Sequence, residues 1–128
     1  MPMGLETTFR GLIDLITMKA MTFEGPNGEN IIESEIPAEF AKEAEMRRQE
    51  LIESLAEFDE EIEDKYLSGE ALPVDMIKKS IRKGTIARSF FPVMMGSAIK
   101  NKGVQLALNA VIEYLPNPLE KENYAFDL

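Results

Sequence analysis

The sequence contains neither cysteine nor histidine among its 128 residues. Disulfides, thiolate nucleophiles, Cys/His zinc sites and serine–histidine–aspartate triads are therefore excluded together. No apolar run approaches the roughly 20 residues that a membrane span needs. No basic segment followed by an apolar one marks a secretory signal at the N-terminus. We expect a chain without a membrane partner or a targeting segment.

The motifs of phosphate binding are also missing. There is no Gly-x-x-x-x-Gly-Lys-[Ser/Thr] loop, no Gly-x-Gly-x-x-Gly, no Asp-x-x-Gly and no Asn-Lys-x-Asp. Taken alone, the chain has no candidate catalytic residue for phosphoryl transfer. An Asp-x-Asp-x-Asp-Gly calcium loop is absent too, so we interpret the acidic run at residues 59–64 as a solvated helix and predict no metal site.

Acidic residues are abundant but unevenly placed. The net charge is −9, and residues 33–70 hold fourteen acidic and four basic residues, a net of −10, which leaves the remainder at +1. An acidic surface repels nucleic-acid phosphates, so we expect no direct, sequence-specific binding of RNA or DNA. A localised acidic face favours a basic partner instead.

The first third of the chain predicts a β-hairpin. Residues 16–20 alternate apolar and polar, Gly25-Pro26-Asn27-Gly28 is strong turn chemistry, and residues 31–36 can return as a second strand. A helix over residues 12–21 is the alternative, because Leu12, Leu15 and Ile16 also fit a 3.6-residue period.

Three helices are predicted next, over residues 37–58, 59–67 and 73–84. Pro37 and Pro73 suit helix starts, where the missing N–H costs nothing, and Gly84 is the expected C-terminal end of the third. The residues predicted to face the core at helical spacing are Phe40, Ala44, Leu51, Leu55, Phe58, Ile62, Tyr66, Leu67, Val74, Ile77 and Ile81.

A second stripe on the first helix is acidic. Its members, at offsets of 0, 4, 11, 14 and 18 residues, are Glu39, Glu43, Glu50, Glu53 and Glu57. Like charges at i,i+4 repel one another by a few tenths of a kcal/mol. The pattern allows either an ordinary solvated helix face or a docking surface for basic side chains.

Residues 91–103 predict a strand, a polar loop and a helix. We expect a short buried strand at residues 92–95, a turn at Gly96, and a helix over residues 103–115 that covers the strand with Val104, Leu108, Val111 and Leu115 on one face. In open α/β sheets, a loop at a strand's carboxyl end is a common ligand site.

The same loop carries a family resemblance. Gly96-Ser97-Ala98-Ile99-Lys100-Asn101-Lys102-Gly103-Val104-Gln105 resembles the last guanine-specificity motif of the translational GTPases of the elongation factor G family. The surroundings agree in order, and the segments that do so are Pro2-Met3-Gly4-Leu5-Glu6, Phe9-Arg10-Gly11-Leu12-Ile13-Asp14-Leu15, Met18-Lys19-Ala20, Ile36-Pro37-Ala38-Glu39, Lys65-Tyr66-Leu67, Ile81-Arg82-Lys83 and Tyr114-Leu115-Pro116-Asn117-Pro118. The likeness covers nearly the whole chain.

The resemblance implies a piece of a GTP-binding domain with an α+β fold. Residues 1–8 would be a strand end of the GTPase core, and residues 9–88 the G′ insertion, a β-hairpin and three helices. The insertion would pack on residues 89–116, the last strand, guanine-specificity loop and helix of a P-loop GTPase core. Residues 117–128 would lead toward a second domain.

The resemblance also implies the roles of individual residues. The Ala98 N–H would reach the oxygen of the guanine base, Ser97 would hold the loop, and Lys100 would support the base or the neighbouring motif. An N–H aimed at that oxygen selects guanine over adenine, whose amino group would face it. GTP or GDP with Mg²⁺ would bind the intact parent, and we expect neither nucleotide binding nor hydrolysis by this chain alone.

Partners and compartment follow from the same likeness. The family's G′ insertion meets the basic C-terminal domain of the ribosomal stalk protein, which favours the docking interpretation of the acidic stripe. The other expected partner is the remaining GTPase core with its later domains. The tail, with Asn117-Pro118 and Asn123-Tyr124-Ala125, is similar to the mitochondrial form and close bacterial relatives, which implies the mitochondrial matrix or otherwise the bacterial cytoplasm. A stand-alone acidic module for a basic protein is the competing hypothesis.

Overall fold

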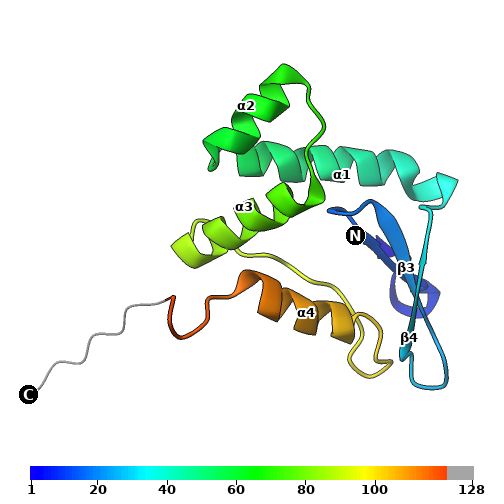
Figure 1. Cartoon of the computed structure of the whole chain (residues 1–128). Helices are drawn as coiled ribbons and strands as arrows, with labels where there is room; N and C mark the ends of the chain where they lie inside the picture. Colours follow the sequence, from blue (N-terminus) through cyan, green and yellow to red (C-terminus); the bar gives the residue numbers. More distant parts are fainter. Residues whose placement is uncertain (121–128) are drawn as a thin grey trace, which may run out of the picture.

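The computed structural model of the chain describes residues 1–120. Residues 121–128, which include most of the predicted 117–128 linker and the Asn123-Tyr124-Ala125 tail, lie outside the described residues. The fold is α+β, as predicted: an antiparallel sheet with strand order β1-β2-β3-β4 is followed by four α-helices (Figure 1). None of these helices is long and apolar enough to cross a membrane.

The strands are short and follow one another directly in the chain. They are β1 (Pro2–Met3), β2 (Gly11–Asp14), β3 (Lys19–Glu24) and β4 (Asn30–Ser34), with a short 3-10 helix at Glu6–Thr8 between the first two. The predicted hairpin is confirmed as β3–β4, with Phe23 opposite Ile31 in the register. The alternative helix over residues 12–21 is wrong.

The sequence reasoning missed β2 and the turn that joins it to β3. The Asp14 carboxylate closes this turn, accepting hydrogen bonds from the Ile16 N–H at 2.9 Å and the Thr17 hydroxyl at 2.7 Å. Met18 takes a positive φ of 55°, so the chain reverses before β3 begins. Aspartate commonly closes a turn in this way, and the Asp-x-x-Thr spacing was the available signal.

The helices are α1 (Ala38–Ala56), α2 (Glu60–Ser68), α3 (Val74–Ala87) and α4 (Val104–Tyr114). Pro37 and Pro73 stand immediately before α1 and α3, as predicted. Gly69 ends α2 with a φ of 72°, the left-handed conformation that glycine adopts without a steric cost.

The predicted end of α3 at Gly84 is wrong. The helix continues to Ala87, and Arg88 takes the left-handed conformation with a φ of 60°, while the Ser89 N–H donates to the Gly84 carbonyl at 2.9 Å. Gly84 is buried, and a Cβ there would lie 1.9 Å from the ring of Phe90. The glycine makes room for an aromatic side chain and does not end the helix.

One core lies among the helices. The buried residues of this helical core are Leu55, Ile62, Ile77, Ile81 and Tyr114, all at most 4% exposed. The predicted inward faces of α1 and α3 are thereby confirmed at Leu55, Ile77 and Ile81. Leu67 is an exception, because its side chain is 75% exposed.

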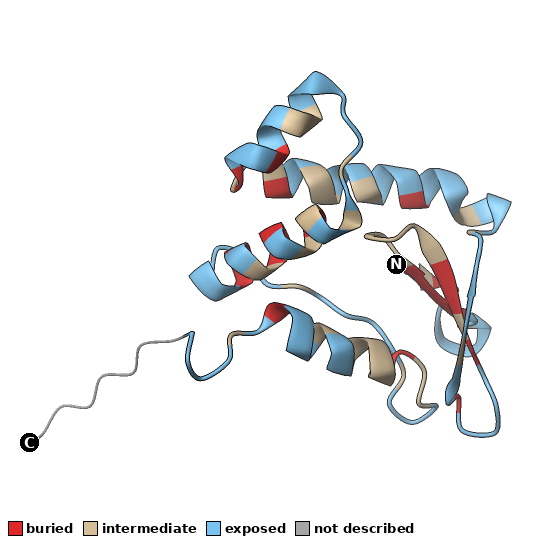
Figure 2. Ribbon diagram, viewed as in Figure 1, coloured by how far each residue is buried: buried red, intermediate tan, exposed pale blue. Residues whose placement is uncertain are grey.

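Two smaller cores lie on the sheet. On one face Ile13 and Ala20 pack with Ala44 of α1, and on the other Leu12, Met21 and Phe23 form a cluster that Leu106 of α4 joins. Figure 2 shows buried residues along the sheet and on the facing sides of α1 and α3. The sheet therefore separates α1 from the start of α4.

The buried strand predicted at residues 92–95 is not present. The segment is irregular, and Val93 is 80%, Met94 45% and Met95 51% exposed. A strand needs a neighbour for its backbone hydrogen bonds, and within residues 1–120 no other strand runs beside this segment. The predicted covering face of α4 is also open, since Leu108 and Val111 are more than half exposed.

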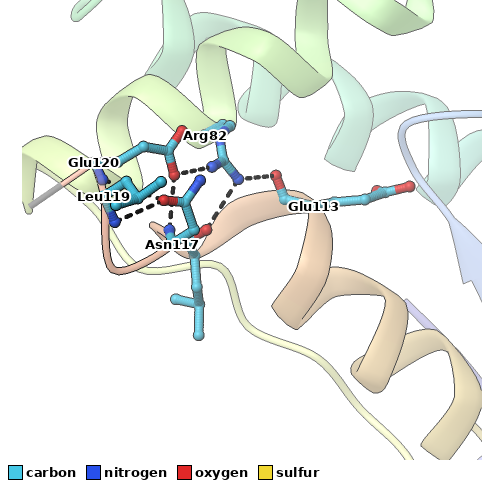
Figure 3. A network of polar contacts seen from close by, with 6 residues as sticks. Arg82, Glu113, Asn117, Leu119 and Glu120 are labelled. Carbon is cyan, nitrogen blue, oxygen red and sulfur yellow. Dashed lines mark hydrogen bonds and ion pairs between the residues drawn. The ribbon is translucent and has the colours of Figure 1, made fainter.

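A cluster of polar contacts attaches the end of α4 to α3 (Figure 3). The Arg82 guanidinium donates to the carbonyls of Glu113 and Leu115, both at 2.9 Å, and also pairs with the Glu120 carboxylate. Carbonyls at a helix C-terminus lack partners within the helix, and a cation there also matches the helix dipole. Arg82 therefore caps α4 from the neighbouring helix.

Candidate functional site

The loop at residues 97–102 is closed by its own backbone. The Ser97 N–H donates to the Lys102 carbonyl at 2.8 Å, and the Lys102 N–H returns to the Ser97 carbonyl at 3.0 Å. Inside this pair the Asn101 N–H donates to the Ala98 carbonyl at 3.1 Å. Asn101 has a φ of 49°, a left-handed conformation that asparagine tolerates better than most residues. The loop is thus a compact turn of defined shape.

Two of the predicted loop residues line a shallow hollow. Ser97 and Lys100 border a space of about 300 Å³, whose other walls are Pro2, Gly4, Leu5, Glu6, Phe9, Met95 and Gly96. Ala98 is exposed, and within residues 1–120 its N–H has no hydrogen-bond acceptor. The loop thus presents one unpaired backbone donor, at Ala98, and one lysine, Lys100, of which only Lys100 lines the hollow.

The five glutamates of the predicted stripe are all exposed, but the N-terminal ones have internal partners. Glu39 pairs with Arg10 at 2.5 Å. Arg47 lies between Glu43 and Glu50, at 3.9 Å and 3.0 Å from their carboxylates. Exposed ion pairs such as these contribute at most about 1 kcal/mol. They nevertheless reduce the negative potential along α1 between Glu39 and Glu50.

The C-terminal end of the stripe borders a second hollow, of about 420 Å³, between α1 and α2. Its lining combines three carboxylates, from Glu53, Glu57 and Glu63, with Ala56, Tyr66 and Leu67. The sequence predicted that Leu67 faces the core and that Glu63 belongs to a solvated acidic run, because the packing of α2 on α1 was not predicted. In the described residues no group of three or more Asp or Glu side chains has a geometry that could hold a metal ion.

Glu53 is the best-connected carboxylate of this hollow. It accepts hydrogen bonds from the Tyr66 hydroxyl at 2.7 Å and from the Gln49 amide at 3.0 Å. These two hydrogen bonds lower the pKa of Glu53 below its ordinary value of 4.5, and the bond from Tyr66 has the larger effect. The same contact raises the pKa of Tyr66 above 10.0. Glu53 therefore stays ionised through the neutral range while it joins α1 to α2.

This contact predicts a pH-dependent effect of Tyr66→Phe. A carboxylate with a lowered pKa in the folded state adds stability above its unfolded pKa, and the gain is lost as pH falls through the folded pKa. A phenol with a raised pKa adds stability below 10.0 and loses it at higher pH. We expect Tyr66→Phe to lower Tm between about pH 4.5 and pH 10, and the difference to shrink outside this window.

The control is the same substitution in a Glu53→Gln background. Thermal unfolding is followed by circular dichroism at several pH values. In the Glu53→Gln background the Tm difference caused by Tyr66→Phe should not change with pH in the acidic range, because residue 53 no longer titrates. A pH-independent effect of Tyr66→Phe in both backgrounds would mean that the phenol contributes by packing alone.

The chain is therefore an α+β unit with two candidate sites. One is the closed turn at residues 97–102 with the hollow beside it, and the other is the acidic hollow between α1 and α2. No family model matches the chain. It is similar to the crystal structure of a protein from Thermus thermophilus, with a TM-score of 0.76 and 30% sequence identity. The match covers 94% of this chain and 18% of the Thermus chain. The two proteins share this fold over nearly all of the present chain, which spans less than a fifth of the longer protein.

Proposed function

We propose that this chain is part of a translational GTPase of the elongation factor G type, a ribosomal translocase that moves tRNA and mRNA. In this proposal residues 97–102 supply the guanine-base loop, and α1 and α2 supply an acidic surface for the ribosomal stalk protein. The observation that carries the proposal is the ordered motif series together with a closed turn whose Ala98 N–H is unpaired within residues 1–120.

The geometry of the turn supports the base-binding role. Because the Ser97–Lys102 backbone pair fixes the shape of the turn, the Ala98 N–H needs no reorganisation to bind a carbonyl oxygen of the base. Lys100 lines the hollow beside the turn and can approach the edge or face of a purine ring there. The phosphates and Mg²⁺ of GTP would be held by residues outside this chain, which carries none of their motifs.

The acidic hollow supports the partner surface. Glu53, Glu57 and Glu63 lie around apolar atoms of Tyr66 and Leu67, a combination that suits the aliphatic stem and charged head of a lysine or arginine. A basic stalk domain presents such side chains. The wide exposure of Leu67, at 75%, leaves this apolar edge available to a partner.

Exposed apolar side chains beyond α3 support the second expected partner, the remaining GTPase core. The most exposed of them are Phe91, Val93, Ile99, Leu108, Ile112 and Leu119. Contiguous exposed apolar surface typically marks an interface. The Thermus protein, in which this fold occupies 18% of the chain, offers a precedent for such further polypeptide.

The proposal predicts a contrast between this chain and the full-length product of its gene. The full-length protein should bind GTP with Mg²⁺ and hydrolyse it in the presence of ribosomes. The isolated 128 residues should show no saturable GTP binding by calorimetry, because one base contact cannot offset the entropy lost on binding. ATP is the matched control ligand for both proteins.

Two results would reject the proposal. Micromolar GTP binding by the isolated chain would contradict the proposal that residues outside this chain hold the phosphates and Mg²⁺. A gene product with no phosphate loop and no guanine-nucleotide binding would favour the alternative, a stand-alone acidic module for a basic protein, which the α1–α2 hollow supports equally well.

A further inference from the structure

The proposed guanine-base loop, residues 97–102, rests against the turn of the β3–β4 hairpin, which lies far earlier in the chain. The side-chain amide of Asn101 donates to the backbone carbonyl of Asn27 at 2.9 Å, a contact across 74 residues. The Gln105 amide reaches the Gly28 carbonyl at 3.5 Å from the start of α4. Asn101 and Gln105 thus contact the hairpin, whereas Ser97 and Lys100 of the loop border the hollow.

The fit on the hairpin side is close. Gly28 is buried with a φ of +63°, and a Cβ there would lie 2.8 Å from the Lys100 carbonyl. The hairpin turn is itself held by Glu29, whose carboxylate accepts the Asn27 N–H at 2.9 Å. Beneath the contact, Leu106 joins the cluster of Leu12, Met21 and Phe23, so the loop, α4 and the sheet share one apolar support.

We propose that the turn at residues 25–28 positions the guanine-base loop, and that Asn101 is the positioning residue that connects them. This inference rests on the proposed function. Asn101 meets two requirements at once: its backbone takes the left-handed bend that closes the Ser97–Lys102 pair, and its side chain fixes the bend to Asn27. The direction of the Ala98 N–H therefore depends on a hairpin that does not touch the base.

Asn101→Gly separates these two requirements. Glycine keeps the positive φ without strain and removes only the side-chain amide. Asn27→Ala is the matched control, because the acceptor on Asn27 is its backbone carbonyl, which the substitution retains. Gly28→Ala perturbs the same contact from the hairpin side, since its methyl group would press on the Lys100 carbonyl and the positive φ of residue 28 would strain the turn.

The first measurement uses this chain and no nucleotide. We expect Asn101→Gly to change amide chemical shifts and hydrogen exchange at residues 97–102 and at residues 26–29, with a Tm close to that of the wild type. Gly28→Ala should affect the same two segments, and Asn27→Ala should leave residues 97–102 unchanged. Changes confined to residue 101 and its immediate neighbours would overturn the positioning role.

The second measurement uses the full-length gene product and compares GDP with 2-aminopurine riboside diphosphate, which lacks the base oxygen. Loss of one well-aimed hydrogen bond corresponds to a roughly five- to tenfold loss of affinity. We expect Asn101→Gly and Gly28→Ala to weaken GDP by that factor and to leave the analogue unchanged. Equal effects on both nucleotides, or none, in a protein that binds GDP would overturn this inference alone. A gene product that binds no guanine nucleotide would reject the proposed function and the inference together.

Discussion

Replacement of Ile77 by alanine is expected to lower the free energy of unfolding by about 2–5 kcal/mol. Ile77 is 0% exposed at the centre of the helical core, where it packs with Leu55 of α1 and Ile62 of α2. Its truncation removes apolar contacts from three helices and leaves a cavity among them. Small domains have a total stability of about 5–15 kcal/mol, so this variant should lose a large fraction of it.

Urea denaturation followed by circular dichroism measures this loss, and Ile86→Ala is the control. Ile86 lies on the same helix, carries the same side chain and is 36% exposed. The control should change stability by less than about 1 kcal/mol. Similar losses in both variants would mean that burial in the helical core does not account for the effect, since alanine has the higher helix propensity and would favour the helix at both positions.

Local chemistry was sufficient to predict much of this fold. Pro37 and Pro73 mark helix starts because a proline at this point sacrifices no backbone hydrogen bond. The 3.6-residue spacing of Ala44 and Leu55 indicated the buried side of α1, since a helix repeats its faces at that period. Gly25-Pro26-Asn27-Gly28 indicated the β3–β4 hairpin for an equally local reason.

The failures concern relations between distant segments. Residues 92–95 have the composition of a buried strand, yet composition cannot supply the neighbour that a strand requires, and none lies beside them within residues 1–120. Gly84 was predicted to end α3 because glycine often does, but its role depends on Phe90, which packs edge-on against Phe58 at 5.9 Å. No local pattern contains either relation.

The candidate sites divide in the same way. Helical periodicity placed five glutamates on one stripe, and all five are exposed on one helix and its C-terminal cap. It could not show that Arg10 and Arg47 pair with the N-terminal members, or that Glu63 of α2 joins Glu53 and Glu57. Likewise, the motif indicated the Ser97–Lys102 turn, whereas the support from Asn27 depends on the tertiary fold.

Reversal of charge at Glu50, Glu53 and Glu57 to lysine is expected to weaken binding of a basic stalk-type domain by roughly ten- to hundredfold. Each substitution removes one attraction and adds one repulsion, and an exposed pair contributes about 0.2–1 kcal/mol. Glu53 and Glu57 border the hollow in which we place a partner's basic side chain. Because exposed charges are screened, the difference should be largest at low salt and shrink as salt rises.

The control reverses three exposed carboxylates elsewhere, Glu24, Glu33 and Glu45, so that the net charge changes by the same amount. Calorimetry against the basic domain at two salt concentrations compares the two triple variants, each first checked for a wild-type circular dichroism spectrum. If the acidic hollow is the docking surface, only the first variant should lose most of its affinity, because the control leaves the carboxylates around Tyr66 in place. Equal weakening in both would mean that the partner responds to net charge alone, and unchanged affinity of the first variant at low salt would exclude α1 as the docking surface.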